Sequence, residues 1–223
     1  MSKLYIVATP IGNLEDITMR AIRVFGEVDL ILAEDKRVSR KLLDHYEIKK
    51  EMLSWHQHSK IKDWQKVKDL LKGGKDIALI TDAGTPGVSD PGGKLIELVL
   101  NEVPETEIIP LPGPSSLTAI ISVAGVPMER FLFLGYLPHK KGRQTLFTQI
   151  KDSTIPVIFF ESVHRIMKAL DQLLDCDRQL IVGRELTKKF ETVYRGTAKE
   201  VLEILSKDIV QQKGEFVIIV NNR

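Results

Sequence analysis

The chain has 223 residues, a formal net charge of +2, 43% apolar residues and 28% charged residues. This composition fits a globular protein large enough for two cores and excludes extensive disorder. Cys176 is the single cysteine, which excludes an intramolecular disulfide and a cysteine-based zinc cage. The mostly apolar run from Leu4 to Ala8 is too short for a secretory signal, and no run approaches the roughly 20 apolar residues that span a membrane. We expect a soluble cytoplasmic protein without a membrane partner.

The first half of the chain alternates short apolar runs with a helical pattern. We expect strands at residues 4–8, 29–33, 76–81 and 107–109, and a helix with one apolar face at 61–71. Continuous apolar runs bounded by glycine, proline or charge are typical of parallel strands covered on both faces. The alternation predicts βαβ units and an open α/β sheet.

A proline-rich segment, Leu111–Ser116, interrupts this alternation. Pro112 and Pro114 flank a glycine, and neither a helix nor a central strand continues through such a sequence. Ser115 or Ser116 can then cap a helix over 117–124. We therefore expect two domains, residues 1–112 and residues 113–223.

The second half predicts another α/β domain. Two neighbouring segments, 179–186 and 190–197, are close enough in sequence to form an antiparallel hairpin, which predicts a mixed sheet. The expected strands are 131–134, 156–160, 179–182, 192–195 and 216–220, and the expected helices lie near 141–151, 163–174 and 198–206.

Three loops rich in glycine, proline and small polar residues follow predicted strands. They are Ala8–Leu14, Thr81–Gly92 and Leu111–Ser116. Ligands of open α/β sheets bind beyond the carboxyl ends of the strands. The glycines of the second loop allow close approach of a ligand to the backbone, and its polar side chains can bind an amino acid, a ribose or an amine. A long structural connection capped by Asp90 is the alternative for this loop, but three such loops favour a ligand site. The polar side chains of the second loop are Asp82, Thr85, Ser89 and Asp90.

Several common motifs are excluded by spacing. There is neither a G-x-G-x-x-G dinucleotide fingerprint nor a G-x-x-x-x-G-K-[ST] phosphate loop. The segment Gly87–Pro91 resembles a hydrolase nucleophile elbow, but Pro91 stands where that motif requires glycine. His56 and His58 form an H-x-H pair with no obvious third ligand nearby, so we expect no metal site.

Charged clusters also follow predicted strands. Glu34–Arg37 and Arg184–Lys189 are expected on the same rim as the glycine-rich loops, although a solvated charged face is the alternative for each. A basic loop follows Tyr136 and combines positive charge with an aromatic neighbour, which suits a phosphate and a stacked base. The basic residues of this loop are Lys140, Lys141 and Arg143.

The same segments together resemble the ribosomal RNA small subunit methyltransferase I family of the tetrapyrrole methylase superfamily. The most specific stretch is Asp-Ala-Gly-Thr-Pro-Gly-Val-Ser-Asp-Pro-Gly over residues 82–92. The resemblance covers nearly the whole chain, although members often carry a helical C-terminal appendage beyond the segment that matches 214–217, and this chain ends at Arg223. The matching segments are 4–14, 33–37, 82–92, 111–116, 160–165, 184–188 and 214–217.

This resemblance implies two α/β domains of tetrapyrrole methylase type, S-adenosylmethionine in the cleft between them, and usually a homodimer. It implies methyl transfer to the ribose 2′-hydroxyl of a cytidine in the decoding region of small-subunit (16S) ribosomal RNA, free or within the 30S subunit. Asp82 and Gly84 belong to the expected cofactor loop. By matching positions, the other expected cofactor residues are Pro10, Ile11, Thr85, Val88, Ser115 and Ser116.

A ribose hydroxyl is a poor nucleophile that benefits from a base to accept its proton. We expect Glu185 as that base, with Asp82 as the second choice, and Lys188 and Arg184 orienting the ribose and phosphate. Arg37, Lys140, Lys141 and Arg143 are expected to hold RNA. The alternatives are methylation of a tetrapyrrole, methylation of the diphthamide precursor, and a non-catalytic RNA-binding protein.

Overall fold

The two halves of the chain form two separate sheets. The structure, a computed structural model, describes residues 1–56 and 59–222. Unit 1 comprises Met1–Ser115 and unit 2 comprises Ser116–Arg223. This division falls three residues beyond the expected boundary and within the same proline-rich segment.

Unit 1 contains a five-stranded sheet in the order β3-β2-β4-β1-β5, in which every pair of neighbours is parallel. The four strands expected in the first half are confirmed. β3 was not expected, because three residues are too few to show a periodic pattern. The strands are β1 (Lys3–Val7), β2 (Leu30–Ala33), β3 (Met52–Ser54), β4 (Ile77–Ile80) and β5 (Glu107–Leu111).

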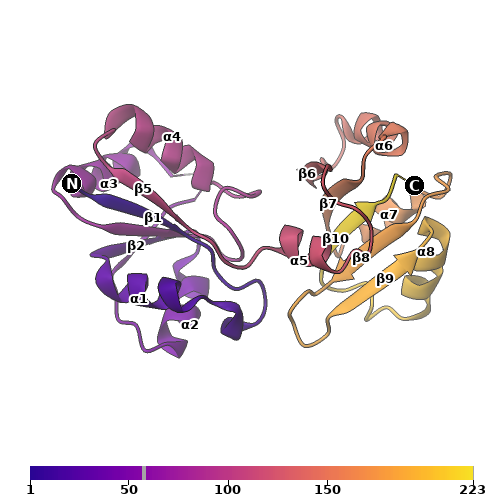
Figure 1. Cartoon of the computed structure of the whole chain (residues 1–223), viewed down its shortest axis with the longest axis horizontal. Helices are drawn as coiled ribbons and strands as arrows, with labels where there is room; N and C mark the ends of the chain where they lie inside the picture. The colour runs from indigo at the N-terminus through magenta and orange to yellow at the C-terminus, as the bar shows by residue number, and fades with distance from the viewer. Residues whose placement is uncertain (57–58, 223) are drawn as a thin grey trace. The chain divides into compact units, whose positions relative to one another are not determined.

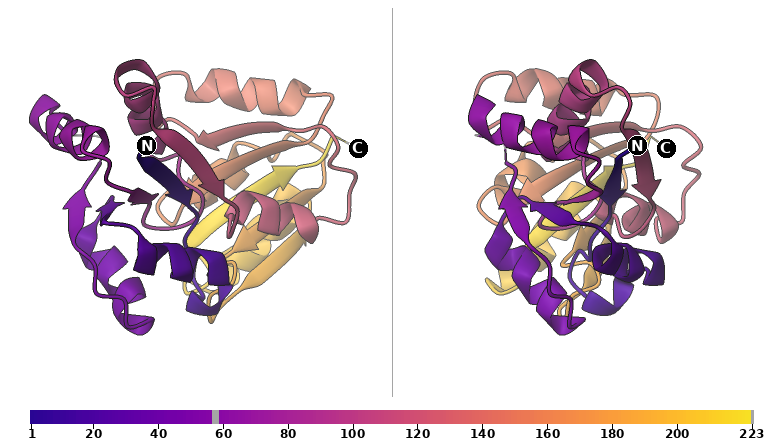
Figure 2. Two further views of the ribbon diagram at one scale, coloured as in Figure 1. Left: turned by 60° about the vertical axis from the view of Figure 1, so that its left-hand side comes forward. Right: turned by 90° about the vertical axis from the view of Figure 1, so that its left-hand side faces the viewer.

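Helices cover both faces of this sheet, as Figure 1 shows and Figure 2 shows from two other directions. Alternate residues of one strand belong to opposite faces: Ile31 packs with the core beneath α1 and α2, whereas Leu32 packs with the core beneath α3 and α4. Two buried faces explain why the strands are apolar throughout. The helical segments are η1 (Leu14–Asp16), α1 (Met19–Glu27), α2 (Lys36–His45), α3 (Ile61–Lys72) and α4 (Gly92–Glu102).

Unit 2 contains a mixed sheet in the order β6-β7-β10-β8-β9. β6 and β7 are parallel, and the other neighbours are antiparallel, including the predicted hairpin of β8 and β9. The mixed sheet and the two-domain α/β fold are therefore confirmed. The strands are β6 (Leu132–Tyr136), β7 (Val157–Ser162), β8 (Leu180–Arg184), β9 (Thr192–Gly196) and β10 (Glu215–Val220).

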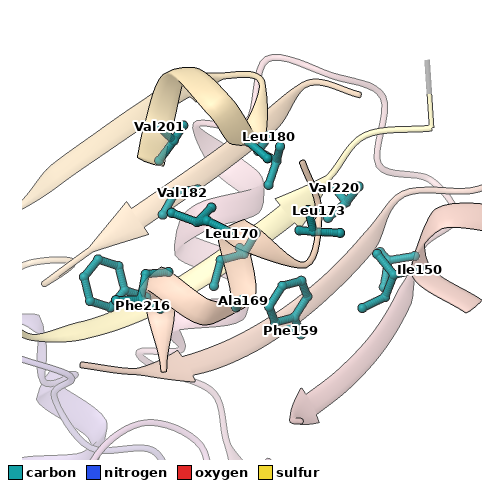
Figure 3. Packing of buried hydrophobic residues seen from close by; sticks show 14 of the residues in the cluster. Ile150, Phe159, Ala169, Leu170, Leu173, Leu180, Val182, Val201, Phe216 and Val220 are labelled. Atoms are coloured by element: carbon teal, nitrogen blue, oxygen red, sulfur yellow. The ribbon is translucent and has the colours of Figure 1, made fainter. Parts of the chain in front are cut away.

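The core of unit 2 lies between this sheet and the helices α6, α7 and α8. Figure 3 shows Phe159 and Phe216 of the sheet beside Leu170 of α7, and all three side chains are fully or almost fully buried. Within the described ranges, no helix is long and apolar enough to cross a membrane. The helices of unit 2 are α5 (Ser116–Ser122), α6 (Arg143–Asp152), α7 (Ile166–Asp171) and α8 (Ala198–Lys207).

Candidate functional site

The three glycine-rich loops follow three strands that are neighbours in the sheet, β4, β1 and β5. β1 leads into α1, whose core lies on one face, whereas β4 leads into α4, whose core lies on the other. Such a point, where connections leave adjacent parallel strands toward opposite faces, opens a crevice at the carboxyl ends and is the usual ligand site of open α/β sheets. The first two loops and the third as far as Ser115 belong to unit 1. The cofactor position between two domains stays a prediction.

Hydrogen bonds join these loops to one another. The Thr9 amide donates to the Gly84 carbonyl (2.9 Å) and the Gly84 amide donates to the Thr9 carbonyl (3.0 Å). The Thr85 hydroxyl donates to the Pro114 carbonyl (3.2 Å), so the second loop also binds the third. A Cβ atom at Gly84 would lie 3.5 Å from the Ile11 side chain. The structure therefore brings the three loops together, and Ile11, Gly84 and Thr85 are the expected cofactor residues that take part in these contacts.

The second loop has an unusual backbone that its own side chains hold in place. Gly84 and Gly87 have φ values of +84° and +91°, in the left-handed region that glycine adopts without strain. The Asp90 carboxylate accepts hydrogen bonds from the Gly87 amide (2.8 and 2.9 Å) and the Gly92 amide (2.7 Å). Asp90 thus has the structural role that the alternative interpretation of this loop gave it, that of capping the connection. Its hydrogen bonds fix the backbone at Gly87 and Gly92.

An acidic cluster lies beside the second loop, where β2 and β4 end. Glu34 accepts a hydrogen bond from the Thr81 hydroxyl (2.6 Å), and Asp82 accepts one from the Asp35 amide (3.0 Å). Burial, together with the nearby charges of Glu34 and Asp35, raises the pKa of Asp82 above its ordinary value. A carboxylate with a raised pKa is a stronger proton acceptor.

Arg37 extends from the same cluster into solvent. Its guanidinium forms an ion pair with Asp35 (2.7 Å), and the Arg37 side chain is 90% exposed. Hydrogen bonds from the side chain and the amide of Arg37 lower the pKa of Asp35 to about 2. An exposed pair of this kind is weak and exchanges readily for another anion, so Arg37 retains the capacity to contact a phosphate.

In unit 2, Lys188 joins two carboxylates at one edge of the mixed sheet. Its ammonium lies 3.0 Å from Glu185 Oε1 and 2.9 Å from Glu215 Oε2, and the Glu215 amide also donates to Glu185 Oε1 (2.9 Å). Burial disfavours the ionised form of Glu185, but hydrogen bonds from the Glu215 amide and Lys188 outweigh it, and the pKa of Glu185 is lowered. Glu185 is therefore a weaker base than we expected.

Arg184 does not have the expected role of orienting a ribose and phosphate. It is buried, and its guanidinium donates to three carbonyl groups, those of Lys213 (2.7 Å), Phe190 (3.1 Å) and Val210 (2.8 Å). These bonds satisfy a buried cation and tie together the two loops on either side of it. Arg184 is a structural residue, which corrects the prediction from sequence.

Arg143 is also not placed for the RNA contact that we expected. It is buried at the start of α6, and its guanidinium forms an ion pair with Glu161 (3.1 Å) and donates to the Gln172 side chain (2.8 Å). A phosphate in solvent cannot reach a group in that position. Lys140 and Lys141 of the same loop are exposed.

Glu161 and Arg165 are functional candidates that the sequence did not reveal individually. Glu161 is fully buried at the end of β7 and also pairs with Arg165 (2.7 Å). Arg165 donates to the Leu137 carbonyl (2.7 Å), and Arg143 donates to the Pro138 carbonyl (3.3 Å). The two arginines thereby hold the start of the basic loop. A signal for them exists in the sequence, since a glutamate ends an apolar run and an arginine follows four residues later.

The H-x-H pair of the sequence consists of His56 and His58, and His58 lies outside the described residues. Across the described residues, no group of three or more histidine, cysteine, aspartate or glutamate side chains is arranged to hold a metal ion.

Comparisons with known proteins agree with this architecture. Residues 3–202 match the family model of the Tetrapyrrole (Corrin/Porphyrin) Methylases. Relatives named ribosomal RNA small subunit methyltransferase I include one from Thermotoga maritima, 41% identical with both chains fully covered, and one from Haemophilus influenzae, 42% identical over 99% of this chain and 78% of that protein.

Solved structures show the same fold at low sequence identity. Diphthine synthase has a TM-score of 0.73 at 14% identity, covering 99% of this chain and 90% of that one. The uroporphyrin-III C-methyl transferase of Thermus thermophilus in complex with S-adenyl homocysteine has a TM-score of 0.64 at 17% identity, covering 97% and 96%. The glycine-rich switch point and the full-length relatives lead to one assignment. The chain belongs to the tetrapyrrole methylase family and, within it, to the ribosomal RNA small subunit methyltransferase I family.

Proposed function

We propose that this protein is an S-adenosylmethionine-dependent methyltransferase of small-subunit ribosomal RNA, and that the acceptor is the ribose 2′-oxygen of a cytidine. The observation that carries the proposal is the convergence of three loops at the switch point of unit 1, in a chain that matches relatives named for that RNA over 97–100% of its own length. An enzyme with this substrate works with ribosomes in the cytoplasm, and the family resemblance favours a homodimer.

The loops of unit 1 fit the cofactor. S-adenosylmethionine, when bound, supplies a methyl group on a positively charged sulfur and also carries an amino group. The left-handed backbone at Gly84 and Gly87 keeps side chains away from the ligand, and a Cβ atom at Gly84 would extend toward Ile11 and Pro114. The negative charges of Glu34 beside the loop and of Asp82 on the loop complement a cationic ligand.

The expected cofactor residues then have simple roles. Pro10, Ile11 and Val88 offer apolar contacts, whereas the hydroxyls and amides of Thr85, Ser115 and Ser116 offer hydrogen bonds; Ser115 directly precedes α5, which starts at Ser116.

Asp82 is our choice for the group that accepts the proton, in place of Glu185. With the cofactor bound as methyl donor, Asp82 would accept the hydroxyl proton that the 2′-oxygen loses when it is methylated. Burial raises the pKa of Asp82, whereas Glu185 is held as a carboxylate by Lys188 and the Glu215 amide. Asp82 also lies on the cofactor loop itself.

The basic loop of unit 2 is our choice for the RNA contact. Lys140 and Lys141 are exposed, and Glu161 holds the start of their loop through Arg143 and Arg165. Lys188 adds an ammonium at the same edge of the sheet. A pre-positioned loop loses little conformational freedom on binding, so its lysines contribute more affinity than mobile ones would.

A methyl-transfer assay tests the proposal. Small subunits from a strain that lacks the enzyme serve as substrate, and nucleoside analysis of the RNA identifies the methylated atom. We expect a 2′-O-methylcytidine. Methylation of a base would contradict the ribose acceptor, and binding of cofactor without any transfer would favour the non-catalytic alternative.

Two variants of the same assay test the base. We expect Asp82→Asn to slow single-turnover transfer about 10²–10⁴-fold, as the loss of a general base does. Glu185→Gln is the matched control, because it also removes one carboxylate charge, and we expect a much smaller effect. The opposite order of effects would return the role of the base to Glu185.

A further inference from the structure

A pocket in unit 1 lies outside the site described so far, with which it shares only Pro91 of the second loop. Its volume is about 380 Å³, and it lies between the starts of α3 and α4. Pockets that bind small ligands have volumes of roughly 300–1,000 Å³, so this one suits a single nucleotide better than a longer segment. Two of its lining residues, Trp55 and Pro91, also line a closely packed region that reaches Thr81 and Gly92, at the two ends of the glycine-rich loop.

The wall of the pocket is apolar and aromatic. Trp55, Trp64, Pro91 and Leu98 all contribute to it. Trp55 is buried, with an exposed fraction of 4%. Its indole N–H has no hydrogen-bond acceptor among the residues that the structure describes. A buried donor left unpaired costs about 1–3 kcal/mol. That nitrogen is itself shielded from solvent, so Trp55 contributes apolar ring surface to the pocket and not a hydrogen-bond donor.

The rim of the pocket is basic. Lys60 and Lys94 both line it, and neither is buried. Lys94 forms an ion pair with Glu97 (2.8 Å), but both side chains are more than half exposed, so the pair is weak. Lys60 precedes α3 and Pro91 precedes α4, so the positive ends of two helix dipoles also face this region. The Lys60 amide at the start of α3 is already used, because it donates a hydrogen bond to the Asp63 carboxylate (2.7 Å).

We propose that this pocket binds an unpaired nucleotide of the RNA substrate, with the base against the tryptophan wall and the phosphate between Lys60 and Lys94. Proteins recognise single-stranded RNA by placing splayed bases against aromatic side chains and phosphates against cations. The inference rests on the proposed function, and it adds a contact in unit 1 to the basic loop of unit 2. In this proposal, unit 1 contacts the RNA substrate directly, beside the glycine-rich loop to which we assign the cofactor.

The tryptophans make the inference directly measurable. The chain has two tryptophans, and both line this pocket. Titration with a single-stranded oligoribonucleotide of about ten nucleotides, a length within the range that such proteins bind, should quench the tryptophan fluorescence. Anisotropy of the same oligonucleotide carrying a dye measures total binding independently.

Substitution of the rim should weaken the interaction measurably. We expect Lys60→Ala combined with Lys94→Ala to reduce the affinity for RNA about 5-fold at 0.1 M salt and to lower the salt slope by about 0.7, because one neutralised phosphate of a single strand contributes about 0.7 to that slope. Lys199→Ala combined with Lys207→Ala is the matched control, since both lysines are exposed on α8 of unit 2. The control should retain quenching, affinity and slope.

Two results would overturn the inference: binding by anisotropy without any tryptophan quenching, or an unchanged affinity and slope in the Lys60 and Lys94 double variant. Failure of the proposed function gives a different result. If wild-type protein transfers no methyl group to small subunits but RNA still quenches the tryptophans, the pocket stands and the enzymatic proposal falls. If transfer occurs without quenching, only the pocket falls.

Discussion

The parallel sheet of unit 1 and the mixed sheet of unit 2 present polar groups in different ways. In unit 1, all strands end at one edge, and the loops beyond β4, β1 and β5 offer backbone amides, hydroxyls and glycines. In unit 2, β10 runs against β7 and β8, so its first residue, Glu215, meets the last residues of its neighbours. Ionised side chains therefore gather at that edge and neutralise one another.

This difference shows where charge is free to act and where it is structural. Glu161 is enclosed by Arg143 and Arg165, and Glu185 is held by Lys188. Among the residues that the structure describes, no cation forms an ion pair with Asp82, whose hydrogen bond comes from the uncharged Asp35 amide, although the nearby Arg37 partly offsets the rise in its pKa. We infer that unit 2 uses its charges mainly to fix loops, whereas unit 1 keeps a carboxylate poised for chemistry.

The largest effect should follow from breaking the buried ion pairs of unit 2. Glu161→Ala leaves Arg143 and Arg165 without their carboxylate in the interior, and removing one partner of a buried pair costs about 3–5 kcal/mol. Hydrogen exchange read by mass spectrometry checks this, because it reports β7 and β10 separately from the strands of unit 1. We expect faster exchange in unit 2 alone.

Glu27→Ala is the control for that substitution. Its ion pair with Arg23 (2.8 Å) is more than half exposed, and such pairs contribute about 0–1 kcal/mol. If Glu161→Ala disturbed the protein as little as Glu27→Ala, the charged edge of unit 2 would not have the structural role that we assign to it.

A bulky side chain in the glycine-rich loop should produce the second largest effect. Gly84→Leu places a branched side chain against Ile11 and Pro114 at a φ of +84°, in the space that we assign to the cofactor. Calorimetry should show the affinity for S-adenosylmethionine reduced more than about 100-fold, equivalent to about 2.7 kcal/mol. Gly26→Leu is the control, since Gly26 is exposed in α1 with no atom within 4 Å of an added Cβ. Unchanged affinity in Gly84→Leu would exclude this loop from the cofactor site.

The sequence predicted most of the fold because local patterns dominate it. Apolar runs bounded by charge, such as Ile77–Ile80, indicate buried parallel strands without further information, and the short connection between β8 and β9 indicates a hairpin. Even the convergence of the loops follows from a general property of parallel sheets. The strand order, which makes β4, β1 and β5 neighbours, is a tertiary property with no local signal.

The sequence was a poorer guide to individual charges. Arg184 and Arg143 resemble surface residues in a basic segment, but their partners lie far along the chain: Arg184 binds the carbonyls of Val210 and Lys213, and Arg143 pairs with Glu161. Whether a charge is buried depends on which distant groups fold around it, and no spacing rule within a segment contains that information. The pKa values of Asp82 and Glu185, which reverse our order of candidate bases, depend on the fold in the same way.

The smallest effect, and the one that compares the two units most directly, concerns those two carboxylates. The pKa of Glu185 is lowered on folding, so its stabilisation is present above the unfolded value near 4.5 and is lost as pH falls through the folded pKa. The pKa of Asp82 is raised above 3.8, so the folded state loses stability as pH rises from that value through the folded pKa.

Near pH 7, Glu185→Gln should therefore destabilise unit 2 by about 1 kcal/mol, since it also leaves the partly buried Lys188 with one carboxylate fewer. Asp82→Asn should leave unit 1 unchanged or stabilise it by up to about 0.5 kcal/mol, a small value because Asp82 is exposed to solvent that screens its neighbours. Hydrogen exchange of each unit, measured near pH 7 and again near pH 4, reads both signs in one experiment. A stabilising Asp82→Asn that abolishes methyl transfer would identify Asp82 as a residue kept for function at the expense of stability, whereas a destabilising Asp82→Asn would show that both units use their carboxylates alike.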